Sequence, residues 1–181
     1  NTLGGLHHAA RGSRGIDNIV PILRTVGEWL RENGADPFLT PCMGSHNGAT
    51  AEGQRAMLET LGMTESAVGM PIRSPMEVVQ VGETPTGEPV WMDGNCHESD
   101  GVLVVNRVKL HTCFGGPPYG SHCESGLAKM LTVGMGKLNG AQSFHDKHTD
   151  LMKGHLLDMT RVILGTGKVW GGVAILEDGF D

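Results

Sequence analysis

Apolar residues recur at helical spacing along several stretches of the chain. Residues 16–33 place Ile19, Leu23, Val26 and Leu30 on one face of a helix. Asp17 is suited to the N-cap position, and Gly34 ends the pattern. The same spacing predicts helices over residues 51–61 and 148–164, with a short helical turn over 64–69.

Short apolar runs bounded by Gly and Pro predict the strands. Residues 37–42 (PFLTPC) form one such run, and residues 101–106 (GVLVVN) are typical of a fully buried strand. Residues 77–82 and 90–92 flank a turn with Pro85 and Gly87, which indicates a hairpin, and residues 169–177 predict a last strand. No pattern is clear in residues 1–10. Alternating helices and strands indicate an α/β fold with a mainly parallel sheet.

The stretch from Glu124 to His145 (ESGLAKMLTVGMGKLNGAQSFH) contains an unusual lysine. Lys129 lies in an apolar helical run, and His145 follows sixteen residues later. Because an ammonium group is costly to bury, Lys129 either extends its head to solvent from an amphipathic helix or has its charge used in a site.

Polar side chains with chemical potential follow the predicted strands. His46 lies in the loop after residues 37–42, and His111 follows residues 101–106. Ligands of open α/β sheets bind at these carboxyl ends, although either histidine could simply cap a turn. Two histidines on opposite sides of one carbon would suit removal and return of a proton on either face. The Arg11–Gly15 turn before the first helix is either a phosphate cradle or a solvated basic loop.

Composition narrows the class of protein. The 181 residues suffice for one domain, and a net charge of −6 argues against binding to nucleic acid or to a membrane surface. Four cysteines do not suggest a disulfide framework. Neither a leader sequence nor a run as long as a membrane span is visible, so a cytoplasmic protein is expected.

Other familiar motifs are missing or weak. The sequence contains neither G-x-S-x-G nor a Walker A motif. His111, Cys113, His122 and Cys123 could hold a structural zinc, but their spacing is not a standard one.

Four blocks, in order, resemble one known family. MGSHNGATAEGQ (43–54), VVNRVKLHT (104–112), ESGLAKMLTVGMGK (124–137) and GAQSFH (140–145) are similar to blocks of the nickel-pincer lactate racemases. The similarity runs from about Gly12 to Asp181. It implies that residues 1–181 form a single three-layer, Rossmann-like domain, equivalent to the N-terminal cofactor-binding domain of a larger protein whose second domain is absent from this chain.

The resemblance also implies a cofactor and a role for each motif residue. The cofactor would be a nickel-pincer nucleotide, a pyridinium bisthiocarboxylic acid mononucleotide carrying nickel, made by dedicated cofactor-synthesis enzymes. Lys129 would be its covalent attachment point and His145 a nickel ligand, with Ser13 and Arg14 at its phosphate. His46 and His111 would be the acid/base pair that racemises a small 2-hydroxy acid by hydride transfer through a 2-keto acid. The alternative is a truncated or divergent member that binds a metal or an anion without turnover.

Overall fold

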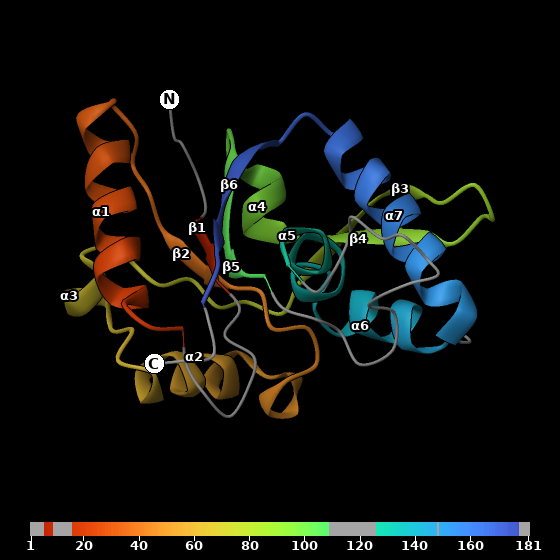
Figure 1. Cartoon of the computed structure of the whole chain (residues 1–181), viewed down its shortest axis with the longest axis horizontal. Coiled ribbons are helices and arrows are strands. Elements are labelled where there is room, and N and C mark those ends of the chain that lie inside the picture. The colour runs from red at the N-terminus through yellow and green to blue at the C-terminus, as the bar shows by residue number, and fades with distance from the viewer. Residues whose placement is uncertain (1–5, 9–15, 109–125, 148, 178–181) are drawn as a thin grey trace.

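A four-stranded parallel sheet lies at the centre of the computed structural model (Figure 1). Its strands are β1 (Leu6–His8), β2 (Leu39–Pro41), β5 (Val102–Arg107) and β6 (Val169–Ile175), in the order β2-β1-β5-β6. All of its pairs are parallel. The structure describes residues 6–8, 16–108, 126–147 and 149–177.

Helices cover both faces of this sheet. Helix α1 (Ile19–Glu32) and the short α3 (Glu65–Val68) lie on one side, and α4 (Gly94–Glu98) and α7 (Thr149–Gly165) lie on the other (Figure 1). The predicted three-layer α/β architecture is therefore confirmed. None of the described helices is both long and apolar enough to cross a membrane.

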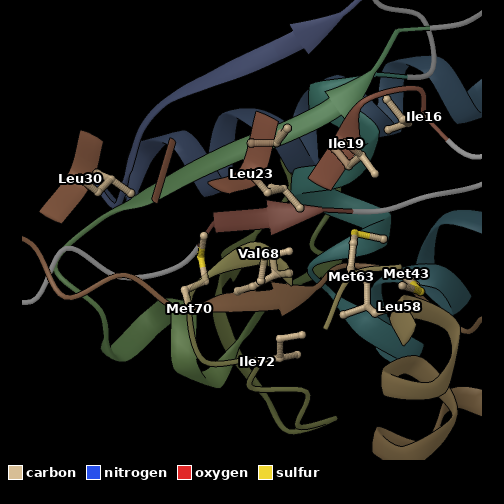
Figure 2. Close-up of a cluster of buried hydrophobic side chains, with 12 residues drawn as sticks. Ile16, Ile19, Leu23, Leu30, Met43, Leu58, Met63, Val68, Met70 and Ile72 are labelled. Atoms are coloured by element: carbon tan, nitrogen blue, oxygen red, sulfur yellow. The ribbon is translucent and has the colours of Figure 1, made fainter. Parts of the chain in front are cut away.

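Two apolar clusters hold the layers together. The first joins the sheet to α1, α3 and α2 (Ala51–Thr60), with Leu23 and Leu58 fully buried (Figure 2). Met43, from the loop after β2, also packs into this cluster. The second cluster lies beneath α7 and contains Val104, Met159 and Ile163. Burial of such apolar surface is the main stabilising contribution in a fold of this size.

The predicted hairpin is confirmed, and it forms a sheet of its own. Strands β3 (Val78–Glu83) and β4 (Pro89–Asp93) pair antiparallel in their own two-stranded sheet. The hairpin contacts α6 (Lys137–His145) and α7, so it lies on the same side of the molecule as both helices (Figure 1).

Three expectations about the elements were wrong in detail. Strand β1 occupies the centre of the sheet, although residues 1–10 gave no pattern; three residues are too few to display a period. Helix α1 begins at Ile19 rather than at residue 16. Its N-cap is Asn18 rather than Asp17, because Asn18 takes the left-handed conformation (φ 55°) and the helix can start only after it.

The third correction concerns the stretch from Glu124 to His145. Its described part is not one continuous helical run. It consists of α5 (Leu127–Lys129), a π-helical segment η2 (Met130–Gly134) and α6, which begins at Lys137. Lys137 has φ 52°, a left-handed conformation that interrupts the helical path.

Candidate functional site

The loop that carries His46 is fixed between the core and η2. It leaves the carboxyl end of β2, and the buried Met43 anchors it in the first apolar cluster (Figure 2). The Gly44 amide donates to the Gly134 carbonyl at 3.1 Å, and Gln54 Nε2 donates to the Gly44 carbonyl at 2.9 Å. These bonds hold the loop rigidly beside the segment that follows Lys129.

Backbone packs directly on backbone where the loop meets η2. A Cβ atom on Gly134 would lie 2.4 Å from the Cys42 carbonyl oxygen, which is closer than real Cβ atoms approach. Gly44 has φ +58°, and a Cβ there would lie 3.0 Å from the Val133 carbonyl oxygen. Glycine is therefore required on both sides of this contact.

The His46 ring is held in one tautomer by its own loop. Its Nδ1 is hydrogen-bonded to the Met43 carbonyl, and a carbonyl can only accept. Nδ1 therefore carries the proton, which leaves Nε2 as the basic nitrogen of the neutral imidazole. Since the residue is only half-buried, the geometry suits a general base at the carboxyl end of the sheet.

Lys129 and His145 lie against the same aromatic ring. Lys129 Nζ is 5.7 Å from the centroid of the Phe144 ring, a distance suited to a cation–π contact. The His145 ring meets Phe144 edge-on, with the centroids 5.2 Å apart. Phe144 is fully buried, Lys129 is half-buried and His145 is exposed. A buried ring thus supports a primary amine and an imidazole at the protein surface.

Lys129 is the last residue before the π-helical segment η2. Met135 N donates to the Met130 carbonyl at 2.8 Å, a bond to the fifth preceding residue. All the residues of η2 are buried, so the amine of Lys129 leaves the helix just before the chain enters the interior. Such π-bulges often occur at functional sites because they re-aim the neighbouring side chains.

The fully buried lysine of this stretch is Lys137, which the sequence reasoning missed. Its Nζ lies 3.2 Å from Asp93 Oδ2 and also donates to the Pro41 carbonyl, and both side chains of the ion pair are completely buried. Asp93 accepts further hydrogen bonds from Thr40 Oγ1 at 3.3 Å and from the Cys96 amide at 3.1 Å. The sequence did contain a signal for this buried lysine, because the apolar stretch holds a second lysine besides Lys129.

Two cysteines border this ion pair in a protonated form. Burial is the main cause that raises the pKa of the Cys42 thiol far above its usual range, and the Lys137 charge opposes it only partly. Burial, followed by the Asp93 charge, also raises the pKa of Cys96 well above its usual value. Neither thiol is therefore a thiolate nucleophile near neutral pH.

The structure brings two of the predicted site residues together, because Lys129 and His145 both contact Phe144. His46 lies in a loop that is bonded to η2 through Gly44 and Gly134. Ser13, Arg14 and His111 lie outside the described residues, as do Cys113, His122 and Cys123 of the zinc alternative. Among the residues that the structure describes, no group of three or more His, Cys, Asp or Glu side chains could hold a metal ion.

An amine and an imidazole that share one supporting ring fit a group tethered at one end and ligated at the other. In such an arrangement His145 would offer one imidazole donor to a metal carried by that group. A parallel sheet covered on both faces by helices, with His46 in the loop beyond β2, makes this chain a three-layer α/β domain, a class whose ligands usually bind at the carboxyl ends of the strands.

Comparison with known proteins identifies the family. Residues 16–149 match the family model described as the lactate racemase N-terminal domain. The chain belongs to this family. No curated protein matches it.

A solved structure has a similar fold. It is the lactate racemase apoprotein from Thermoanaerobacterium thermosaccharolyticum, with a TM-score of 0.62 and 12% sequence identity. The match covers 97% of this chain and 43% of that chain, so the present chain spans less than half the length of that protein.

Proposed function

We propose that this chain is the cofactor-binding domain of a racemase or epimerase that acts on a small 2-hydroxy acid. The observation that carries the proposal is the shared support of Lys129 and His145 by Phe144, in a chain of the lactate racemase N-terminal domain family. In this proposal Lys129 is the covalent attachment point of a nickel-pincer nucleotide, and His145 is the protein ligand of its nickel.

The chain's own residues would bind the nucleotide and move protons. When bound, the nucleotide would supply a hydride acceptor. Nε2 of His46 would take the proton of the substrate hydroxyl, because Nδ1 is already committed to the Met43 carbonyl. His111 would do the same for the opposite enantiomer, and Ser13 and Arg14 would bind the phosphate. The buried Phe144 would fix the amine and the imidazole relative to each other.

Mass spectrometry of protein co-expressed with the cofactor-synthesis enzymes tests the tether. The wild-type chain should carry the nucleotide as a covalent adduct, and Lys129→Ala should carry none. Lys129→Arg is the matched variant, since it keeps the positive charge beside Phe144 but has no primary amine. It should therefore also carry no adduct. Lys168→Ala, in the loop before β6, should retain the adduct. A Lys129→Ala protein that still carried the adduct would refute the assignment.

Variants of the two histidines, co-expressed in the same way, distinguish the role of a nickel ligand from that of an acid/base. His145→Ala should keep the adduct and lose nickel, measured as metal per adduct. His46→Gln should keep both the adduct and the nickel but lose the racemisation of lactate or a related acid. Loss of the adduct itself in His46→Gln would contradict its role as an acid/base.

A second candidate function is a metal- or anion-binding module without turnover. The observation that favours it is the family match itself, since the matching model describes an N-terminal domain rather than a whole racemase. Metal analysis combined with a racemisation assay distinguishes the two candidates. Metal bound stoichiometrically without racemisation of any 2-hydroxy acid would favour the module.

A further inference from the structure

The buried ion pair of Lys137 and Asp93 is costly to build. Both side chains are fully excluded from solvent, and desolvation of two charges usually offsets their mutual attraction. Lys137 also adopts φ 52°, which is unfavourable for a residue with a Cβ atom. Strain and buried charge retained at one residue are more easily explained by a functional constraint than by stability.

The ion pair connects the segments that carry the proposed site. Lys137 is the first residue of α6, whose last residue is His145. Its Nζ donates to the carbonyl of Pro41, the last residue of β2, five positions before His46. Asp93, at the end of β4, accepts a hydrogen bond from Thr40, which lies on β2 beside Pro41. One ammonium group therefore links the start of the His145 helix to the start of the His46 loop.

We propose that Lys137, held by Asp93, is a positioning residue that fixes His46 relative to Lys129 and His145. This inference rests on the proposed function. Lys137 acts from beneath the site and touches neither substrate nor cofactor, because its side chain is completely buried. The π-helical segment η2, between Lys129 and Lys137, is held to the same loop by the bond from Gly44 to Gly134. The His46 loop is therefore fixed at two points: to η2 by this bond, and to the start of α6 by the ion pair.

The rival explanation is that the ion pair only supports folding. Lys137→Met leaves a buried, unpaired carboxylate and should lower Tm by roughly 10 °C or prevent folding. Combining Lys137→Met with Asp93→Asn removes both charges and keeps an acceptor for the Cys96 amide. The double variant should recover most of the lost Tm, so that positioning can be measured in a folded protein.

Two readouts then test the positioning. The first is NMR of the imidazole Cε1–H signals of His46 and His145 in the cofactor-free chain, assigned with His46→Gln and His145→Gln. In the double variant these signals should shift or broaden. Leu30→Ala, at the far end of the first apolar cluster from Met43 (Figure 2), is a destabilised control that should leave the His46 and His145 signals in place.

The second readout is turnover by the cofactor-loaded protein. A displacement of about 1 Å should lower kcat by about 100-fold with KM nearly unchanged. The inference is overturned if the double variant, at recovered Tm, keeps the wild-type imidazole signals. Failure of the proposed function is separate: it would appear as a wild-type chain without an adduct on Lys129, and the imidazole signals would still decide whether Lys137 positions the loop.

Discussion

His155 of α7 lies within ion-pair distance of the β3–β4 turn: its Nδ1 is 3.0 Å from Glu88 Oε2. Its other ring nitrogen, Nε2, lies 3.3 Å from Ser143 Oγ of α6. One buried imidazole thus joins two helices to the hairpin. Lys147 also contacts the Glu88 carboxylate, so three charged or ionisable groups meet at this junction.

The stability of this junction should depend on pH. Burial, and then the Lys147 charge, lower the pKa of His155, although Asp158 and the bond to Ser143 oppose them. The fold therefore favours neutral His155. Its contribution is complete above the unfolded pKa of about 6.5 and is lost as pH falls toward the folded pKa.

Thermal unfolding between pH 8 and pH 5 checks this dependence. Tm of the wild-type chain should fall on acidification, and His155→Gln should remove part of that fall. His97→Gln, at an exposed position of α4, should leave the wild-type slope. Equal slopes for the wild type and His155→Gln would contradict the prediction.

Gly134→Ala should destabilise the chain. The added Cβ would meet the Cys42 carbonyl at 2.4 Å, a contact with backbone that can be relieved only by moving the His46 loop or η2. We expect a loss of about 1–3 kcal/mol in the free energy of unfolding, measured by urea titration.

Gly154→Ala is the matched control for that change. Gly154 lies within α7, and a Cβ there would meet nothing within 4 Å. The substitution should therefore raise stability by about 0.5–1 kcal/mol, as expected for Gly to Ala in a helix. Equal effects of the two substitutions would mean that the contact of the loop with η2 is looser than described.

Cys42 and Cys96 should resist thiol reagents in the folded protein. Both are buried, and burial raises the pKa of both thiols, so a thiolate is scarce and inaccessible. A variant with Cys113→Ser and Cys123→Ser isolates the two residues. Labelling should be negligible in buffer and complete in denaturant, and rapid labelling in buffer would contradict their burial.

The same double cysteine variant tests the zinc alternative. If Cys113 and Cys123 hold a structural zinc, their replacement should lower both the bound zinc and Tm. We expect neither to change, because the proposed function assigns no metal to these cysteines. A parallel loss of zinc and stability would support the alternative.

Glu177 should stabilise the chain at neutral pH and lose this effect in acid. Its carboxylate binds the Arg107 guanidinium and accepts from the Asp17 amide at 2.7 Å, and these bonds, the Arg107 bond first, lower its pKa. Its contribution is present above the unfolded pKa of about 4.3 and is lost as pH falls through the folded value.

Glu177→Gln measures this contribution. It should lower Tm near pH 7 and have less effect near pH 3. Glu98→Gln, at an exposed position of α4, is the control and should change Tm little at either pH. An undiminished effect of Glu177→Gln in acid would show that the carboxylate charge is not what matters.

The spacing of apolar residues was sufficient to predict the elements that bury one face. Helix α1 has its apolar face at Ile19, Leu23 and Leu30, as its spacing indicated. The hairpin followed from its turn residues. Strand β1 was missed because three residues cannot show alternation, and the break at Lys137 was missed because a left-handed residue leaves no trace in an apolar pattern.

The site was predictable only in part. The strand ends placed His46 correctly beyond β2, and the apolar surroundings marked Lys129 as unusual. The support of Lys129 by Phe144 depends on how α6 packs against η2, which spacing along one helix does not describe. The Lys137–Asp93 pair joins residues far apart in the chain, so only the tertiary structure relates them.

Strand β1 has a consequence for anyone who handles the amino end of this chain. Leu6 pairs with Leu39 on one side and with Leu103 on the other, so residues 6–8 connect β2 to β5 and β6 in the sheet. Strands β2 and β5 have no direct ladder in the four-stranded order. A fusion tag, a protease nick or a trimmed start at these residues would therefore open the sheet in its middle, and assays of the proposed site require a protein in which residues 6–8 are intact.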